Sequence, residues 1–346
     1  METLYCGIDA GSSNCHVAVL DESGKWDMDT DIPTSELHLT AFFESLQKNG
    51  ERAKIHLEAA ELAGWIRRII LERTNIEDVV VSDAKQLSWI GKDPRKNDSV
   101  DAFKLAEFLR LGRTHPVYYS DDEKMVTLKK QVKHHDSLSG EQTRIKNKIK
   151  ASLRTQGIII KSSSAFSRRR RPKILREVNN SMVRENLEDM YRLLDNIEEL
   201  SKSSKKRLKS LSEDWPIIEY FMEVPGMGLV LACRFVAYVQ TPWRFSTEKK
   251  LWSYSKLGLT QRSSDGKPLS SPRLDRNGNG TLKDLSRKVF ENAQKRQDNN
   301  AFKRAYQRYL KTTYNHEHAR LSVQRKILTV LWTMWRKNER YDDRRG

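Results

Sequence analysis

Residues 5–20 read Y-C-G-I-D-A-G-S-S-N-C-H-V-A-V-L, and this stretch decides how the N-terminal part of the chain folds. Residues 4–8 alternate as in a strand, residues 11–14 are typical of a turn, and residues 16–20 resume an apolar strand, so we predict a β-hairpin. Asp9 is unusual there, because a half-buried strand favours β-branched and aromatic residues. Three explanations of Asp9 are open. Its carboxylate could bind a metal ion, or the turn could bind phosphate as in actin-like ATPases and sugar kinases. Alternatively, Asp9 is an ordinary polar residue at a strand end.

The residues that follow predict an α/β layer fold. After a turn at residues 24–26, we expect strands at 53–58 and 78–82 and helices at 36–47, from 58 through 71, and at 98–111. The first helix is predicted to begin at the N-cap Ser35 and to bury one face, formed by Leu37, Phe42, Phe43 and Leu46. Such folds place catalytic groups at strand ends and on the loops beyond them.

The charge of the chain is strongly positive and unevenly distributed. Its 346 residues include 63 Lys and Arg against 46 Asp and Glu, a net charge of +17. Residues 1–115 hold 14 basic and 20 acidic side chains, net −6, and the remainder holds 49 and 26, net +23. An acidic unit joined to a basic remainder suits a metal-dependent enzyme whose other parts bind a polyanion, so we predict nucleic acid as the partner.

Cysteine usage and hydropathy indicate the compartment. Cys6, Cys15 and Cys233 have no C-x-x-C spacing and are odd in number, which indicates a reducing environment without a disulfide framework or a zinc finger. No apolar run approaches the roughly 18 residues of a membrane span, and the N-terminus does not resemble a signal peptide. We therefore expect a cytoplasmic protein with no membrane partner.

Residues 116–212 are predicted to form a basic helical hairpin, and residues 213–346 a mainly helical C-terminal domain. In the first helix of the hairpin, Ile145, Ile149 and Leu153 follow i,i+4 spacing. In the second helix, Leu187, Met190, Leu194 and Ile197 follow the 3-4-3 spacing of a coiled coil. The hairpin could dimerise or hold nucleic acid. In the C-terminal domain, Ser246 is predicted to cap a helix. Residues 258–280 form a long polar loop of a length that is usually functional or disordered, before helices at 282–295, 300–312 and 318–337.

Several residues of the basic remainder are predicted to contact nucleic acid. Four consecutive arginines stand in a segment that either is a flexible solvated loop or contacts phosphate. The segment V-P-G-M-G resembles a helix-hairpin-helix turn, where glycines let backbone N–H groups approach phosphate, although an ordinary turn explains it equally well. With two cations of the long polar loop, the predicted contacts are Arg168, Arg169, Arg170, Arg171, Gly226, Gly228, Arg262 and Lys267.

Four carboxylates occupy the places where an RNase H-like fold carries its metal ligands: Asp9, Glu58, Asp98 and Asp101. Cleavage of a phosphodiester by two metals needs several carboxylates around ions about 3.5–4 Å apart, and Mg2+ prefers oxygen ligands. Asp98 and Asp101 share a helical face, although Asp98 as N-cap of a capping-box-like start is the alternative. Glu58 is preferred to its rival Glu61 because Glu58 ends a strand, whereas Glu61 falls in the predicted helix.

These acidic motifs resemble those of the insertion-sequence-110 family of transposases, to which Piv-type DNA invertases are related. The motifs are G-I-D-A at Asp9, L-E-A at Glu58 and K-N-D-S-V-D-A at residues 96–102. Downstream, the resemblance continues through V-P-G-M-G at 224–228, F-S-T-E-K-K-L-W-S-Y-S-K-L-G-L-T at 245–260, R-N-G-N-G-T-L at 276–282 and H-A-R-L-S-V-Q-R-K-I-L at 318–328. It therefore covers nearly the whole chain.

The resemblance implies a RuvC-like DEDD domain over residues 1–115, in which Asp9, Glu58, Asp98 and Asp101 bind Mg2+ or, in its place, Mn2+. It further implies that a serine of the C-terminal transposase domain attacks DNA and forms a covalent 5′-phosphoserine intermediate. Family members act as dimers or tetramers whose protomers share one active site. A structured noncoding bridge RNA pairs with the donor and target double-stranded DNA, and the setting is a prokaryotic cytoplasm with association with the nucleoid during action.

Ser264 is the best match to the serine of the family. Members usually show Ser-Gly or Ser-Ser-Gly a few residues after G-L-T-P, whereas residues 258–267 read G-L-T-Q-R-S-S-D-G-K, with Gln261 in place of the proline and Asp265 in place of the first glycine. Ser263 is the neighbouring alternative, and Ser270 and Ser271 are more distant ones.

The sequence thus predicts a Mg2+-dependent, RNA-guided transposase that cuts and rejoins DNA. A metal-only nuclease or Holliday-junction resolvase would use the four acids without Ser264. A non-catalytic RNA-binding scaffold fits the basic hairpin but leaves the order of the acids unexplained. An actin-like ATPase or sugar kinase should also show a second Asp-x-Gly phosphate loop and a glycine-rich adenosine motif, and the sequence shows neither.

Overall fold

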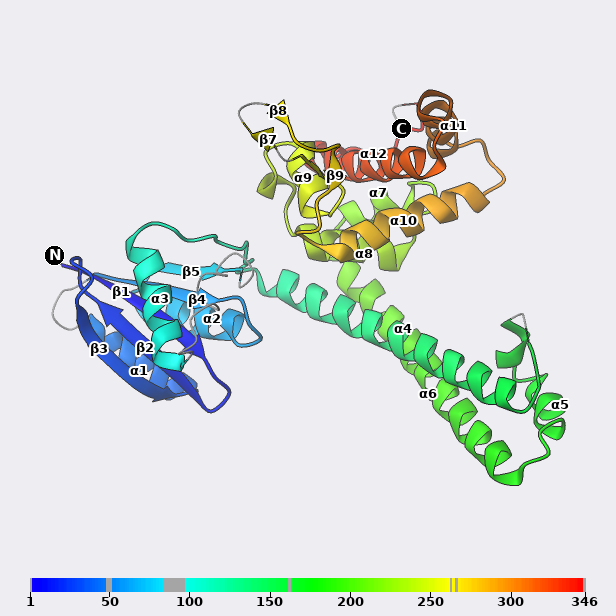
Figure 1. Ribbon diagram of the computed structural model, residues 1–346, viewed down its shortest axis with the longest axis horizontal. Coiled ribbons are helices and arrows are strands. Elements are labelled where there is room, and N and C mark those ends of the chain that lie inside the picture. Colours follow the sequence, from blue (N-terminus) through cyan, green and yellow to red (C-terminus); the bar gives the residue numbers. More distant parts are fainter. Residues whose placement is uncertain are drawn as a thin grey trace. The chain divides into compact units, whose positions relative to one another are not determined.

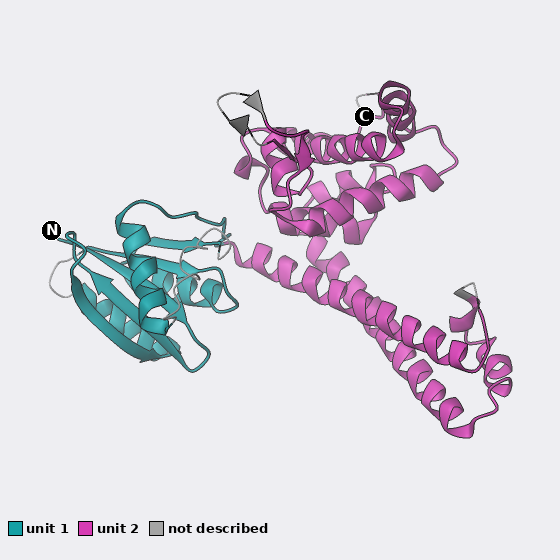
Figure 2. Ribbon diagram, in the orientation of Figure 1, with its two compact units in different colours: residues 1–121 teal, residues 122–346 magenta. Residues whose placement is uncertain are grey.

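The computed structural model describes residues 2–47, 52–83, 97–160, 163–261, 263–264 and 267–344. The chain divides into two compact units, residues 1–121 and 122–346 (Figure 1, Figure 2). Unit 1 is a mixed α/β domain, and unit 2 is mostly helical. The boundaries predicted at 115/116 and 212/213 stay predictions.

Unit 1 is built on a five-stranded sheet with the order β3-β2-β1-β4-β5. The strands are β1 (Thr3–Ala10), β2 (Asn14–Leu20), β3 (Trp26–Pro33), β4 (Arg52–Glu58) and β5 (Asp78–Ser82). The first three form an antiparallel meander, which confirms the predicted hairpin, whereas β4 runs parallel to β1 and β5 runs parallel to β4.

The edge strand β3 was not predicted. It reads W-D-M-D-T-D-I-P, and of its eight residues only Ile32 is buried. Asp27, Asp29 and Asp31 have low strand propensity, but seven backbone pairs with β2 hold the segment in the sheet. Tertiary pairing overrides local preference here.

The two faces of the sheet are covered differently. Helices α1 (Glu36–Leu46) and α2 (Ala63–Arg73) pack on one face, where they enclose an apolar core with Ile8, Ile55 and Leu57. Helix α3 (Asp98–Arg110) lies on the other face (Figure 1). Ser35 caps α1 as predicted. Leu37 was wrongly placed on its buried face: Leu37 is 76% exposed, and Leu39 faces the core with Phe43 and Leu46.

Unit 2 contains the predicted helical hairpin. Helices α4 (Glu123–Thr155) and α6 (Ser181–Ser212) are antiparallel, because Ile145 and Leu153 cluster with residues near the start of α6, whereas Leu128 clusters with Leu208 near its end. The segment between them contains a short 3-10 helix, Ser163–Phe166, and helix α5 (Arg171–Arg176).

The remaining helices of unit 2 enclose the largest apolar core of the structure, around Phe221, Phe235 and Leu331. They are α7 (Ile217–Met222), α8 (Leu229–Val239), α9 (Glu248–Tyr254), α10 (Gly280–Lys295), α11 (Ala301–Thr313) and α12 (His316–Lys337). The N-cap of α9 is Thr247 rather than Ser246. No helix among the described residues is long and apolar enough to cross a membrane.

The polar segment between α9 and α10 was predicted to be a loop, but it contains two short strand pairs. Strand β6 (Leu259–Thr260) pairs with β9 (Arg273–Leu274), and β7 (Ser263–Ser264) pairs with β8 (Lys267–Pro268), both antiparallel.

Candidate active site

Asp9 and Glu58 lie together at one edge of the sheet. In the parallel pair β1 and β4, Ile8 stands opposite Leu57, so the next residues, Asp9 and Glu58, occupy equivalent positions at the carboxyl ends of neighbouring strands, about 4.8 Å apart. Ile8 and Leu57 are fully buried in the α1/α2 core. Because successive side chains of a strand point to opposite faces, both carboxylates project toward the face that α3 covers.

Helix α3 presents Asp98 and Asp101 to the same face. With Ala102 and Leu105 they follow i, i+3, i+4, i+7 spacing, and the two apolar members are buried. A Cβ on Gly7 would stand 1.9 Å from the carbonyl oxygen of Ala102, so the helix backbone lies directly on β1 at a position that only glycine allows. The stripe that carries the two aspartates therefore faces the sheet.

The direction of α3 brings its N-terminus to the carboxylate edge. Arg110, in its last turn, donates to the carbonyl oxygen of Glu22, and a Glu22 carboxylate oxygen accepts from the backbone N–H of Thr3. The C-terminus of α3 thus lies at the start of β1, and Asp98 and Asp101 lie toward the other end, where Asp9 and Glu58 are.

Asn97, not Asp98, caps α3. The Asn97 side chain accepts from the backbone N–H of Val100 at 2.8 Å, so the alternative interpretation of Asp98 as the N-cap is wrong. Glu61 was predicted to lie in a helix, but it lies in the turn before α2. Among the described residues, no three His, Cys, Asp or Glu side chains are grouped closely enough to hold a metal ion. The four carboxylates nevertheless offer the oxygen donors that Mg2+ prefers.

A buried histidine, which the sequence analysis missed, joins α3 to the strands. His56 is fully buried, and its Nδ1 lies 2.7 Å from the Leu105 carbonyl oxygen, so Nδ1 donates. Its Nε2 then accepts from the Ser82 hydroxyl at 2.7 Å, and Ser82 Oγ accepts from the backbone N–H of His115 at 3.2 Å. Burial lowers the pKa of His56. This neutral side chain fixes the helix of Asp101 to the strand of Glu58.

A second histidine stands beside Asp9. His16 is directly opposite Asp9 in the β1/β2 ladder, and its ring nitrogens contact Asp29 at 2.6 Å and Asp31 at 2.8 Å. Burial lowers the pKa of His16, but the hydrogen bonds to the two aspartates outweigh it, so the pKa is raised. Ser99 donates to the other carboxylate oxygen of Asp29 at 2.8 Å, which ties the first turn of α3 to β3. The alternating aspartates of β3 were the sequence signal for this cluster.

The backbone around the predicted nucleophile forms a hairpin. Ser264 pairs with Lys267, and Ser263 pairs with Pro268, so Ser264 is the last strand residue before the connection. Arg262 and residues 265–266 lie outside the described residues. Gln261 donates from its side chain to the Ser270 carbonyl oxygen at 2.8 Å.

The arginines predicted to bind nucleic acid have different surroundings. Arg171 is 8% exposed; it donates two 2.8 Å hydrogen bonds to Asp195, and its guanidinium lies 4.6 Å from the ring centre of Tyr191. Arg168 also contacts Asp195, at 3.3 Å. Arg171 therefore connects α5 to α6, whereas Arg169 and Arg170 are exposed.

The two predicted glycines also differ. Gly226 has a φ of +86°, and a Cβ there would lie 2.3 Å from the carbonyl oxygen of Val289, so this turn packs directly on α10. Helix packing alone accounts for this glycine. Gly228 is the N-cap of α8, and a Cβ there would meet nothing within 4 Å.

Comparison with known proteins bears on both units. A family model described as "Transposase", for the DEDD domain of IS110 elements, matches residues 6–157, and one described as "Transposase IS116/IS110/IS902 family" matches residues 218–308. The chain is 21% identical over 392 aligned positions to the "Insertion element IS110 uncharacterized 43.6 kDa protein" of Streptomyces coelicolor, covering 99% of this chain and 96% of that relative. The resemblance predicted from the acidic and downstream motifs is confirmed, and the chain belongs to the IS110 family of transposases.

Proposed function

We propose that this transposase is a Mg2+-dependent, RNA-guided recombinase that cuts and rejoins donor and target DNA through a covalent phosphoserine. Membership of the family implies DNA transposition. The observation that carries the proposal is the edge of the sheet where Asp9 and Glu58 stand at the carboxyl ends of adjacent parallel strands, on the face covered by the helix that carries Asp98 and Asp101. This arrangement and the mixed sheet order support an RNase H-like, specifically RuvC-like, fold for unit 1.

The four acids are the proposed metal site. Asp9, Glu58, Asp98 and Asp101 would hold Mg2+, or Mn2+ in its place, through their carboxylate oxygens. Bound there, the metal would stabilise the negative charge that develops on the attacked phosphate. His56 would keep the two aspartates of α3 in register with Glu58, because it lies on the same strand as Glu58 and donates to Leu105 of α3.

Ser264 is the proposed nucleophile. Its Oγ attacks a phosphodiester, the bond from phosphorus to the 3′ oxygen breaks, and the serine proton ends on the departing 3′ hydroxyl. The product is a 5′-phosphoserine, which conserves the energy of the broken bond. A 3′ hydroxyl of the second DNA then attacks this phosphorus, and the proton returns to Ser264 as the serine leaves.

The proposed partners are donor and target double-stranded DNA and a structured noncoding RNA, bound by a homodimer or homotetramer. The +23 charge of residues 116–346 supports binding of these polyanions, since phosphate contacts dominate nucleic-acid affinity. Pairing between RNA and DNA would supply sequence specificity, as in other RNA-guided enzymes.

A metal-only nuclease is the second candidate. Asp265, next to Ser264, favours it, because a carboxylate beside the nucleophile would repel phosphate. Such an enzyme would nick DNA through the four acids and would form no bond to the protein.

Trapping the covalent intermediate separates the two. Full-length protein, RNA transcribed from the flanking DNA, labelled donor and target DNA and Mg2+ would be mixed, denatured and run on a gel. We expect labelled DNA at the mass of the protein, lost in Ser264→Ala, retained in the matched Ser263→Ala control and lost when EDTA removes the metal. Nicked DNA without an adduct in the wild type would instead establish the nuclease, and an adduct that persists in Ser264→Ala would overturn the assignment of the nucleophile.

A further inference from the structure

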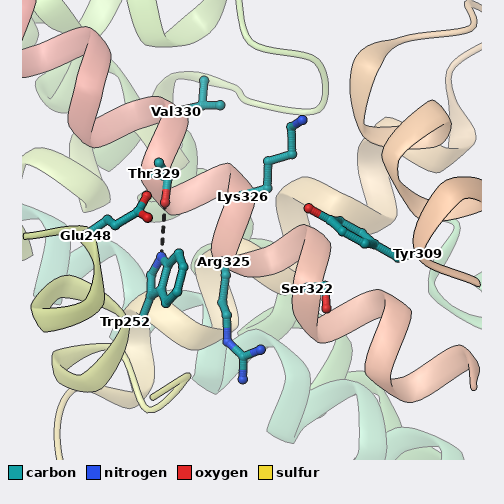
Figure 3. Close-up of a pocket in the computed structure, with 8 residues that line it drawn as sticks. All are labelled: Glu248, Trp252, Tyr309, Ser322, Arg325, Lys326, Thr329 and Val330. Carbon is teal, nitrogen blue, oxygen red and sulfur yellow. Dashed lines mark hydrogen bonds between the residues drawn. The ribbon is translucent and has the colours of Figure 1, made fainter. Parts of the chain in front are cut away.

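A groove of about 450 Å3 is lined by residues of α9, α11 and α12, none of which was predicted to bind nucleic acid (Figure 3). Two aromatic rings, Trp252 from α9 and Tyr309 from α11, line it, together with Arg325 and Lys326 from α12. Figure 3 shows Trp252 near Arg325. The groove thus combines two ring faces with two cations.

The positive charge of the groove is poorly compensated. Glu248 is the one acidic side chain among its lining residues. Within the described part of the chain, neither Lys326 nor the nearby Arg308 forms an ion pair with a carboxylate. Burial, followed by repulsion from Arg308 and Arg304, lowers the pKa of Lys326. A bound anion would relieve this repulsion, so the groove favours a negatively charged ligand.

The aromatic part of the groove is held in a fixed orientation. The indole N–H of Trp252 donates to the Thr329 hydroxyl at 3.1 Å, and the Arg325 guanidinium lies 6.0 Å from the ring centre. Both Trp252 and Tyr309 are half-buried, so part of each ring remains accessible. An oriented, accessible ring beside cations is the combination that binds unpaired bases and their phosphates.

We propose that this groove binds an unpaired stretch of nucleic acid, with a phosphate beside Lys326 and a base against Trp252. A base in a duplex has its faces covered by its neighbours, so only an unpaired base can stack on the indole. The volume is also within the range of sites that enclose a small organic group such as a nucleotide.

The groove adjoins the base of the segment that carries the serine. Arg325 Nε donates to the carbonyl oxygen of Leu257 at 2.8 Å, and Leu257 lies two residues before the start of β6, from which the chain continues to Ser264. A strand held here would be anchored close to the root of the serine hairpin. That role in strand exchange rests on the proposed function, whereas binding itself does not.

Fluorescence anisotropy of dye-labelled oligonucleotides with the full-length protein tests the proposal, in EDTA so that binding is measured without catalysis. Single-stranded DNA, single-stranded RNA and duplex DNA are the three arms. We expect Lys326→Gln to weaken single-strand binding about 3- to 10-fold and to reduce the slope of log K against log salt by about 0.7. Lys337→Gln, an exposed lysine at the end of the same helix, is the matched control and should change little.

Trp252→Leu should weaken single-strand binding about 5- to 100-fold, and Trp252→Phe less, because phenylalanine keeps a ring face. Circular dichroism would verify folding, since Trp252 also packs against the core, and Lys326→Gln tests the groove if Trp252→Leu does not fold. The single-strand arm with the larger loss identifies DNA or RNA as the source of the strand.

Two results would overturn the proposal. The first is an unchanged single-strand affinity in the Lys326 and Trp252 variants, which would favour a protein as the ligand of the groove. The second is an equal loss of single-strand affinity in Lys326→Gln and Lys337→Gln. An equal loss on duplex DNA in Trp252→Leu would overturn the stacked base. Failure of the proposed function is distinguishable, because recombination retained in Asp9→Asn would contradict that function while these binding results stood.

Discussion

The two faces of the five-stranded sheet come from the same strands but are held by different forces. Ile8, Ile55 and Leu57 point to the α1/α2 face, which is apolar and closed by hydrophobic burial. The residues that alternate with them, Gly7, His56 and Asp9 among others, point to the α3 face, where one helix lies on a glycine and is held by hydrogen bonds. The first face stabilises the fold through apolar burial, and the second both anchors α3 and positions polar groups.

The largest effect should come from neighbouring residues on opposite faces. Asp9→Asn should reduce recombination about 10^3-fold or more, since a bound metal supplies several kcal/mol of transition-state stabilisation, and should change the free energy of unfolding by less than about 1 kcal/mol. Ile8→Val should lower that free energy by about 1 kcal/mol and leave recombination near the wild-type level. Strand-exchange assays and urea unfolding measure both. Similar profiles for the two variants would contradict the division between the faces.

The next effect concerns the contact that seats α3. Gly7→Val would place side-chain atoms where the Ala102 carbonyl oxygen and the Ala106 nitrogen already lie, so we expect a loss of about 3 kcal/mol in the free energy of unfolding. Urea unfolding monitored by circular dichroism gives the value. Gly140→Ala in α4, where a Cβ meets only Arg144 at 3.9 Å, is the control and should stabilise by up to about 1 kcal/mol. A Gly7→Val protein as stable as the wild type would show that α3 is not seated on β1.

A smaller effect should follow from removal of the buried histidine. His56→Leu removes the hydrogen bond to the Leu105 carbonyl oxygen and leaves the buried Ser82 hydroxyl without its acceptor, so we expect a loss of about 2 kcal/mol in stability. As a positioning residue, His56 should also affect metal use: the Mg2+ concentration that gives half-maximal cleavage should rise in His56→Leu and, less, in Ser82→Ala. Stability lost with unchanged Mg2+ dependence would make His56 purely structural.

The apolar face could be read from the sequence far better than the polar one. Alternation and i,i+4 spacing are local, so the strands around Ile8 and Ile55 and the helix capped by Ser35 were predicted correctly. The hydrogen bonds of the polar face join distant residues: His56 and Leu105 are 49 positions apart, and no local pattern announces them. The edge strand β3 was missed because its aspartates disfavour a strand in isolation.

The same limit applied to the arginines and to the acids. From sequence, residues 168–171 resemble a solvated loop or a phosphate site, yet Arg171 is buried and donates to the carboxylate of Asp195, 24 positions away. The four acids could be singled out as candidates because strand ends and helix starts are local features. That they lie on a common face of the sheet follows only from the β1/β4 register and from the packing of α3 against Gly7 of β1.

The smallest predicted effect distinguishes the two histidines of the polar face by the sign of their pH dependence. Burial lowers the pKa of His56, so its neutral form stabilises the fold above the ordinary value of 6.5, and this contribution is lost as the pH falls below it. For His16, the hydrogen bonds to Asp29 and Asp31 overcome the effect of burial and raise the pKa, so its contribution is present below 6.5 and is lost as the pH rises through the raised value.

Urea unfolding of the wild type, His56→Leu and His16→Asn at a series of pH values separates these contributions. The loss of stability caused by His16→Asn should be greatest at acidic pH and shrink toward alkaline pH, because only the protonated ring is held by both carboxylates. The loss caused by His56→Leu should instead grow as the pH rises through 6.5. If both losses varied with pH in the same direction, the pKa values of the two histidines would not be shifted in opposite directions. The protonated His16 ring would then not be stabilised by its hydrogen bonds to Asp29 and Asp31.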